Sequence, residues 1–442
     1  MEFVISLKSK EQNQIKDSLQ DNIQDLKKCS NLVINIRYKS KLLTDTFNYI
    51  ATFFSANNLY QIISSISIIV EGQNDLKNDD INSINEFIQN FISISCIQIS
   101  LWKNCFLSGE LFSQLLENLT KCSSLKIFKL DIENNEQIIN FLSVQLQIQS
   151  LKQIQILDIS STDLSLISNE SVSQLFKCVS SLTQLKNLKF SIIFSLDQEA
   201  MDTVYSTLKQ LQQINNLTIR FMQKEATVFT EKLYLIISQN MLNLEYLTLI
   251  FDNCYIHLPH QDFYFQQIIN LKHLSVQIKG YLRSTFRQLS HLINCISQLK
   301  YLEDLDLFIV SSDYNLLSQD LIGIKNILYL KSLKLKLQMD NFYHEEQFIQ
   351  FLNDLFSIQS LQVIEIYSNI CLLTQQQQFL IYHPMILQLM YTNGTDLIEY
   401  FDFSHYFKSN KQLILTILIF KKHLQTILLN NPYQIAFDFH IK

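Results

Sequence analysis

Two clusters of histidine and acidic residues have side chains that could bind a metal ion. His257, His260 and Asp262 lie close together in the sequence, and imidazole and carboxylate groups are ordinary zinc ligands. Pro259 breaks helical spacing between the two histidines, and the sequence fixes no further ligand, so we interpret this segment as a loop between structural units. The segment that begins at His344 lacks the second histidine of a zinc-protease helix. We therefore expect no metal site in either segment.

The other reactive residues also do not form a recognisable catalytic site. Asp304 and Asp306 could act as paired carboxylates, but the sequence identifies no proton-transfer partner. We interpret them as an acidic patch that faces Lys334 and Lys336 one or two strands away. The five isolated glycines exclude a phosphate-binding loop, and the eight cysteines include no Cys-x-x-Cys pair, which favours reduced, buried thiols. We predict that the chain is not an enzyme and holds no cofactor.

Composition narrows the class of protein further. The chain has 442 residues, of which 47% are hydrophobic and 17% charged, and its formal net charge is -6. This apolar content excludes a disordered tail, and the acidic balance gives no surface suited to duplex nucleic acid. The apolar runs are far shorter than the ~20 residues of a membrane-spanning helix, and the amino terminus does not resemble a secretory signal. We expect a cytoplasmic protein that binds neither nucleic acid nor membranes.

An internal repeat dominates the sequence. Each unit has an apolar residue, two arbitrary residues, a second apolar residue, one arbitrary residue and a third apolar residue, and the central residues recur at intervals of 27 to 31 residues. Two weaker units, centred on Ile5 and Ile34, precede the series. A fixed period of this length is typical of a solenoid. The regular units are Ile63-Ile66-Ile68, Ile94-Ile97-Ile99, Leu125-Phe128-Leu130, Ile154-Leu157-Ile159, Leu185-Leu188-Phe190, Ile214-Leu217-Ile219, Leu244-Leu247-Leu249, Leu271-Leu274-Val276, Leu302-Leu305-Leu307, Leu330-Leu333-Leu335 and Leu361-Ile364-Ile366.

This pattern resembles the leucine-rich repeat family, and its period resembles the ribonuclease-inhibitor-type branch of that family. The resemblance covers residues 1–370, and the units are similar to divergent repeats of ciliate proteins. It implies that each unit is a short strand followed by a helix. The family usually has asparagine three residues after the third apolar position, and Asn369 in the last unit matches that rule. Other units have Glu133, Thr162, Ile193, Met222, Asp252 or Val310 there.

The residues in and between the apolar triplets independently predict strands followed by helices. Leucine and lysine alternate over residues 333–337, which places the leucines on one face of a strand. Ser195 and Gln198 have the spacing of a capping box, so we expect Ser195 to cap the helix that follows. The apolar residues of that helix recur at helical spacing; they are Met201, Val204, Leu208 and Leu211.

Units of this kind predict an α/β solenoid. Strands that run in the same direction and are joined by helices form a parallel sheet with the helices on one side. Strands pack about 4.8 Å apart and helices about 10 Å apart, so the stack must curve into a horseshoe with a concave sheet and outer helices. We expect about 13 repeats in residues 1–370, with degenerate repeats at 1–50. Residues 371–442 are predicted to form degenerate repeats or a carboxyl-terminal capping subdomain.

The residues that alternate with the apolar triplets should project from the concave face of the sheet. Aromatic and charged side chains on a rigid sheet are suitable anchors for a protein partner, so we predict that this face is the binding site. The candidate residues are Asn187, Lys189, Asn216, Thr218, Arg220, Tyr246, Thr248, His273, Gln277, Asp304, Asp306, Phe308, Lys334, Lys336 and Tyr367.

The leading hypothesis is therefore a non-enzymatic scaffold, a monomer that binds a partner protein on its concave face. The alternative is a regulatory or substrate-recognition arm of an enzyme, for example a kinase or a ubiquitin ligase, whose catalytic part is supplied by another domain or chain. A catalytic domain encoded in frame upstream would favour the alternative. The sequence does not identify the partner.

Overall fold

The computed structural model divides the chain into two compact units, residues 1–221 and residues 222–442. Among the described residues of both units, strands recur at about the interval of the repeat, and the described helices lie between successive strands. The residues that the structure describes are 2–7, 12–37, 43–71, 78–91, 93–102, 117, 119, 122–133, 151–161, 169–191, 197–222, 227–252, 267–279, 287–311, 322–339, 358, 360–361, 363–368, 386–391 and 415–419.

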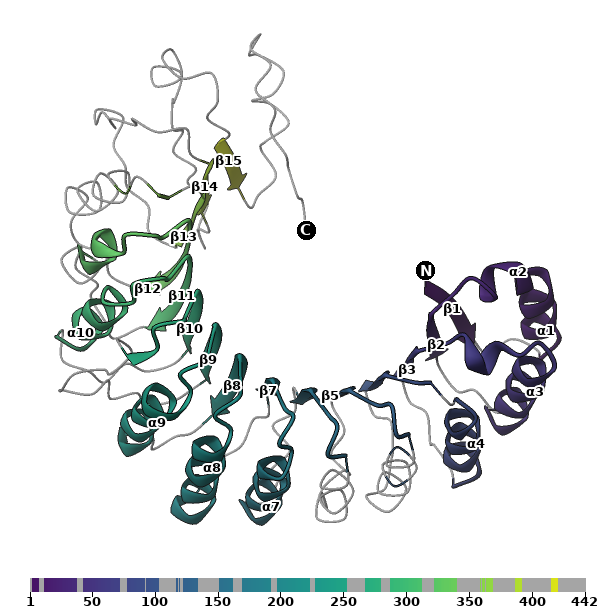
Figure 1. Ribbon diagram of the computed structural model, residues 1–442. Coiled ribbons are helices and arrows are strands. Elements are labelled where there is room, and N and C mark those ends of the chain that lie inside the picture. Colours follow the sequence, from purple (N-terminus) through teal and green to yellow (C-terminus); the bar gives the residue numbers. More distant parts are fainter. Residues whose placement is uncertain are drawn as a thin grey trace, which may run out of the picture. The chain divides into compact units, whose positions relative to one another are not determined.

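The first unit contains a parallel sheet in which each strand pairs with the next one along the chain. The described helices all lie on one side of this sheet (Figure 1). Its strands are β1 (Glu2–Leu7), β2 (Asn31–Arg37), β3 (Ser65–Glu71), β4 (Cys96–Trp102), β5 (Ile127–Glu133), β6 (Ile156–Ser161), β7 (Asn187–Ser191) and β8 (Asn216–Met222), which ends at the boundary. Its helices are α1 (Gln12–Asp21), α2 (Ile23–Leu26), α3 (Leu43–Ala56), η1 (Leu59–Gln61), α4 (Asn78–Gln89), α7 (Asn169–Ser180) and α8 (Gln198–Gln210).

The second unit repeats this arrangement. Its strands also pair in parallel and in sequence order, so the predicted α/β solenoid with a parallel sheet and outer helices is confirmed. The strands are β9 (Tyr246–Asp252), β10 (His273–Lys279), β11 (Asp304–Ser311), β12 (Ser332–Met339), β13 (Val363–Ser368), β14 (Ile386–Tyr391) and β15 (Leu415–Ile419). The helices are α9 (Thr227–Asn240), α10 (Arg287–Ile296) and the short η3 (Ile322–Asn326).

The apolar triplets form the core between the strands and the helices. Every triplet residue from Ile63 to Leu335, and Leu361 after them, is buried. In the first unit, buried aromatic side chains from α3, η1 and α4 pack against one another and against Phe91, which follows α4. Phe87 lies 5.5 Å from Phe54 and 5.0 Å from Phe91 between ring centroids, and Tyr60 packs edge-on against Phe91. The core of the first unit therefore contains a cluster of aromatic rings from outside the apolar triplets.

The start of α8 differs from the prediction. The helix begins at Gln198, and its N-cap is Asp197, whose carboxylate accepts a hydrogen bond of 2.8 Å from the backbone N–H of Ala200. The predicted cap at Ser195 was therefore wrong. An aspartate two residues later is an equally strong cap, and its negative charge also favours the positive end of the helix dipole. The predicted apolar stripe of this helix is confirmed, because Met201, Val204, Leu208 and Leu211 are buried.

We call the sheet face opposite the described helices the inner face. Along β9, Leu247 and Leu249 point into the core, whereas Tyr246 is exposed on the inner face. The parallel register aligns equivalent residues of successive strands, so that each inner-face position forms a row across the sheet. These rows bring together residues that are far apart in the sequence.

Candidate functional site

The candidate site lies on the inner face of β9 to β12, where three rows of mainly polar and aromatic residues cross the sheet. We call these twelve residues the inner-face site. The sequence predicted nine of them, and the strand register now places them side by side. The first row is Tyr246, His273, Asp304 and Ser332; the second is Thr248, Ser275, Asp306 and Lys334; the third is Ile250, Gln277, Phe308 and Lys336.

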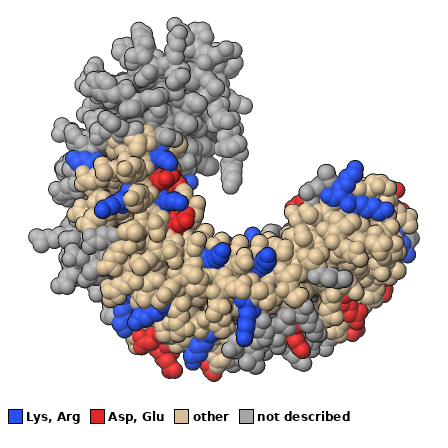
Figure 2. Space-filling model, viewed as in Figure 1, with Lys and Arg blue, Asp and Glu red and all other residues tan. Residues whose placement is uncertain are grey.

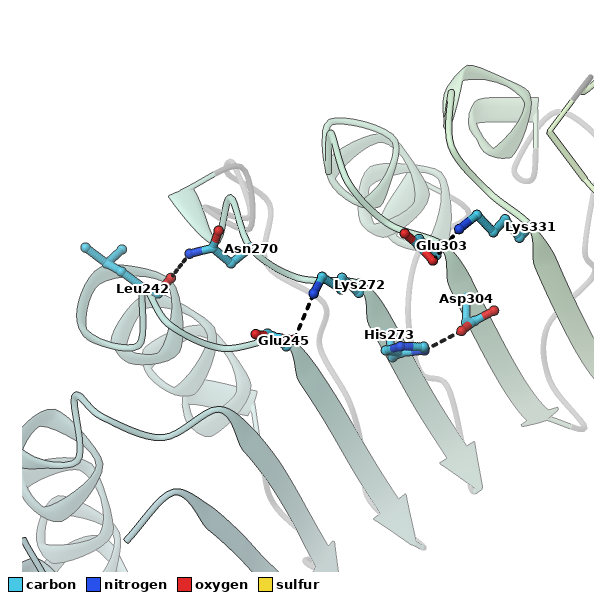
Figure 3. Close-up of polar contacts among 8 residues, drawn as sticks. All are labelled: Leu242, Glu245, Asn270, Lys272, His273, Glu303, Asp304 and Lys331. Atoms are coloured by element: carbon cyan, nitrogen blue, oxygen red, sulfur yellow. Dashed lines mark hydrogen bonds and ion pairs between the residues drawn. The ribbon is translucent and has the colours of Figure 1, made fainter. Parts of the chain in front are cut away.

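The first row is a stack followed by an ion-pair contact. The rings of Tyr246 and His273 are 4.1 Å apart between centroids and only 6° from parallel. On its other side, His273 contacts the carboxylate of Asp304 through Nδ1 (Figure 3). Tyr246 covers one face of the imidazole ring of His273, and the carboxylate of Asp304 contacts Nδ1 of the same ring. These two contacts hold the imidazole in a fixed orientation. A fixed ring can contribute to binding without the entropy cost of being ordered by the ligand.

The second and third rows combine acidic, basic and aromatic groups. The hydroxyl of Ser275 donates to Asp306 Oδ2 at 3.1 Å, and the ammonium of Lys336 lies 4.3 Å from the centre of the Phe308 ring. Asp306 is directly opposite Lys334 in the register of β11 and β12. Of the predicted acidic patch, Asp306 thus faces a lysine on the adjacent strand, whereas Asp304 lies opposite Ser332. Figure 2 shows acidic and basic side chains next to one another over this part of the second unit.

A second set of charges lies at the amino-terminal ends of the same strands. Glu245, Lys272, Glu303 and Lys331 each precede the first residue of a strand, and their charges alternate from one strand to the next (Figure 3). Lys272 Nζ is 2.9 Å from Glu245, and Lys331 Nζ is 2.7 Å from Glu303. We call these four residues the charge ladder. These four residues were not predicted from the sequence, although the sign of the charge alternates at this one position of successive repeats.

The ion pairs of the charge ladder shift the pKa values of two of its members, Glu303 and Lys272. The hydrogen bond from Lys331 holds the pKa of Glu303 below its ordinary value. Electrostatic interactions with Lys331, His273 and Lys272 lower this pKa further. The hydrogen bond to Glu245 raises the pKa of Lys272, with a further contribution from Glu303 on its other side. Both shifts favour the charged forms of Glu303 and Lys272.

The first unit carries a smaller set of inner-face contacts. Lys189 on β7 forms an ion pair of 3.1 Å with Asp158 on β6, and Ser160 donates to Asp131 on β5 at 2.9 Å. The sequence analysis missed Asp158 as a candidate, although it lies between the core residues Leu157 and Ile159. The other predicted residues of this unit lie at inner-face positions of β7 and β8, and they are Asn187, Asn216, Thr218 and Arg220.

Most of the described cysteine thiols are buried, and the described metal-ligating side chains do not gather into larger groups. No group of three metal-ligating side chains occurs among the described residues. The thiols of Cys29, Cys122, Cys178 and Cys295 are buried, and that of Cys96 is partly buried. Burial raises the pKa of the Cys178 thiol to about 11 and that of Cys122 in the same direction, which leaves little nucleophilic thiolate at neutral pH.

Some predictions fall on residues that the structure does not describe. The segment with His257, His260 and Asp262 and the segment from His344 lie outside the described residues. Tyr367 occupies a row position on β13 opposite Lys336, but its side chain is not described. Among the described residues, no helix is long and apolar enough to cross a membrane.

Comparison with protein-family models gives no match for this chain, and comparison with curated proteins also gives none. The fold and the inner-face site therefore provide the evidence on function.

Proposed function

We propose that this chain is a non-enzymatic leucine-rich repeat protein of the ribonuclease-inhibitor type, which binds a partner protein on the inner face of its sheet. The near-constant period, the strand and helix in each unit and the burial of the apolar triplets support the family assignment. The observation that carries the binding proposal is the inner-face site, in which aromatic, acidic and basic side chains occupy adjacent positions on four rigid strands.

The chemistry of the inner-face site fits a folded protein or a structured peptide. Tyr246 and Phe308 offer aromatic surface, which is the residue class most often found in binding hot spots. Asp304, Asp306 and Lys336 lie among them and can fix the orientation of a partner through complementary charge. Contacts within the sheet already hold these side chains in place, so a partner would pay little entropy to order them.

The test compares substitutions on the two sides of the sheet. Tagged full-length protein is used to capture partners from the cells that express it, and the affinity of each purified partner is then measured by calorimetry. The double variant Tyr246→Ala with Lys336→Glu removes one aromatic anchor and reverses one exposed charge on the inner face. We expect this variant to lose about tenfold or more in affinity.

The matched control variant is Lys209→Glu, which makes the same charge reversal on an exposed residue of α8. It should retain the affinity of the unsubstituted protein. The proposal is wrong if the inner-face variant binds every partner normally while the α8 variant releases them. Circular dichroism and urea unfolding of both variants establish that any loss reflects the surface and not the fold.

A further inference from the structure

A row of exposed apolar side chains lies beside the charge ladder in the second unit. In the repeats of β9 to β12, a short turn leads into each strand, and the second and third residues of this turn are exposed. Across the four turns before β9 to β12, the exposed fraction of the apolar residues at these positions ranges from 50% for Leu242 to 78% for Leu328. We call this set the apolar rim, and its members are Leu242, Ile269, Tyr301, Leu328 and Tyr329.

The equivalent turns of the first unit are mainly polar. The turns before β6, β7 and β8 place Lys152, Thr183, Gln184 and Gln212 at exposed positions. The repeat architecture therefore does not require apolar residues there. Five large apolar side chains are exposed on four consecutive turns, and exposed apolar residues that gather on one part of a protein mark an interaction surface.

The apolar rim and the charge ladder form one rigid edge. The backbone N–H groups of Lys331 and Ser332 both donate to the carbonyl of Glu303, at 2.7 and 3.0 Å, and the same double contact joins Lys272 to the repeat after it. Between turns, the amide of Asn270 donates to the carbonyl of Leu242 at 2.9 Å (Figure 3). The rings of Tyr301 and Tyr329 stack with centroids 6.2 Å apart. The edge can therefore meet a partner without reorganising.

The order of charges along the ladder is self-complementary. From β9 to β12 the charges run negative, positive, negative, positive. When a second copy of this ladder is turned antiparallel, every glutamate faces a lysine: Glu245 faces Lys331 of the second copy, and Lys272 faces its Glu303. The same reversal places Ile269 against Tyr301 of the second copy and Leu242 against Leu328. A two-fold symmetric interface has this antiparallel geometry.

We propose that the apolar rim and the charge ladder form a homodimer interface, in which two copies of this chain associate antiparallel through the edge of β9 to β12. This inference goes beyond the proposed partner site, because it uses the turns and strand starts and not the inner face. The edge spans four strands, or about 14 Å. A surface of this length is at the small end of specific interfaces, so the dimer forms weakly and depends on protein concentration.

Sedimentation velocity of the full chain over roughly a hundredfold range of concentration tests the dimer. The unsubstituted protein should shift from monomer to dimer within this range. Lys272→Glu places two like-charged pairs in the interface and should weaken dimerisation by about tenfold. Lys186→Glu is the matched control, since Lys186 precedes β7 at the same repeat position in the first unit; it should leave dimerisation unchanged.

The double variant Lys272→Glu with Glu303→Lys distinguishes antiparallel pairing from other causes. It removes the alternation within one chain but restores opposite charges between the two copies, so dimerisation should recover to within about threefold of the unsubstituted protein. Failure to recover in a protein that circular dichroism shows to be folded would overturn the antiparallel pairing.

The apolar contribution is tested by Ile269→Ser with Leu328→Ser, which should abolish the dimer. The control is Ile62→Ser, which removes an exposed apolar residue from a turn of the first unit and should have no effect. The proposal is overturned if the unsubstituted protein stays monomeric at every concentration, or if it dimerises equally well after the rim substitutions.

Discussion

Tyr246 and His273, which are 27 positions apart in the chain, stack face to face on neighbouring strands with their ring planes 6° apart. The stack exists because β9 and β10 pair in a register that places the first residue of one strand opposite the first residue of the other. Asp304 then occupies the same position on β11 and contacts the histidine. Residues at the same position of three successive strands thus contact one another in turn, from Tyr246 through His273 to Asp304.

The stack should be measurable as a coupling between the two residues. We expect a double-mutant cycle of Tyr246→Ala and His273→Ala to give a coupling free energy of about 0.5–1 kcal/mol in the free energy of unfolding. The value is modest because both side chains are partly exposed. Urea unfolding at pH 7 provides the measurement. A parallel cycle of Tyr246→Ala with Lys336→Ala, which lie on strands that do not adjoin, should give a coupling near zero.

The aromatic cluster of the first unit should contribute far more to stability than any inner-face residue. Phe87 is fully buried and contacts Phe47, Phe54, Tyr60 and Phe91. We expect Phe87→Ala to lower the free energy of unfolding by about 3–5 kcal/mol, because it leaves a cavity that rigid neighbouring rings cannot fill. Urea unfolding followed by circular dichroism checks this value.

Two further substitutions bracket the effect of Phe87→Ala. Phe87→Leu keeps most of the volume and should cost less than about half as much. Ile62→Ala, at an exposed site in the same unit, should change the free energy of unfolding by less than about 0.5 kcal/mol. Equal losses for the buried and the exposed substitution would contradict the placement of this cluster in the core.

Because of Tyr60, we expect the free energy of unfolding to decrease in alkaline solution. Burial raises its pKa from 10.0 to about 12 in the folded protein, and its hydroxyl donates to the carbonyl of Ala51 at 3.1 Å. Because the unfolded chain loses this proton first, the free energy of unfolding should fall as the pH rises from the unfolded to the folded pKa. The slope contributed by one such group is at most about 1.4 kcal/mol per pH unit.

The variant Tyr60→Phe isolates this contribution. At pH 7 it reports only the loss of the hydrogen bond, a reduction of about 1 kcal/mol in the free energy of unfolding. Between pH 10 and 12, unfolding of the variant should depend less steeply on pH than unfolding of the unsubstituted protein. Identical slopes for the two proteins would show that Tyr60 does not titrate differently in the folded and unfolded states.

The sequence predicted the fold well because the repeat encodes it redundantly. The spacing of triplets such as Leu302-Leu305-Leu307 identifies the strand, its buried face and the direction of the chain at once. The cap of α8 was missed because Ser195 and Asp197 both suit an N-cap, and only the local path of the backbone selects between them. The periodicity of the sequence therefore predicts which helices and strands form more reliably than it predicts the residues at which they begin and end.

The candidate site was predicted less completely than the fold. Alternation along a strand identifies which residues face away from the core, and it placed His273, Asp304 and Asp306 correctly on one face. It does not say which neighbours interact, since a stack or an ion pair also depends on side-chain rotamers. Glu245 and Lys272 were not predicted because each lies just before the first residue of its strand, and alternation within a strand does not extend to that position.

The double backbone contact at the starts of β10, β11 and β12 affects how the sequence of such a chain can change in evolution. Successive repeats differ in length, yet Tyr246, His273, Asp304 and Ser332 remain aligned, because the register is set where each strand begins. An insertion or deletion between strands therefore leaves the neighbouring rows in place. Substitutions on one strand can therefore be selected without altering the register of the next strand. Binding specificity can thus change one strand at a time while the fold stays the same.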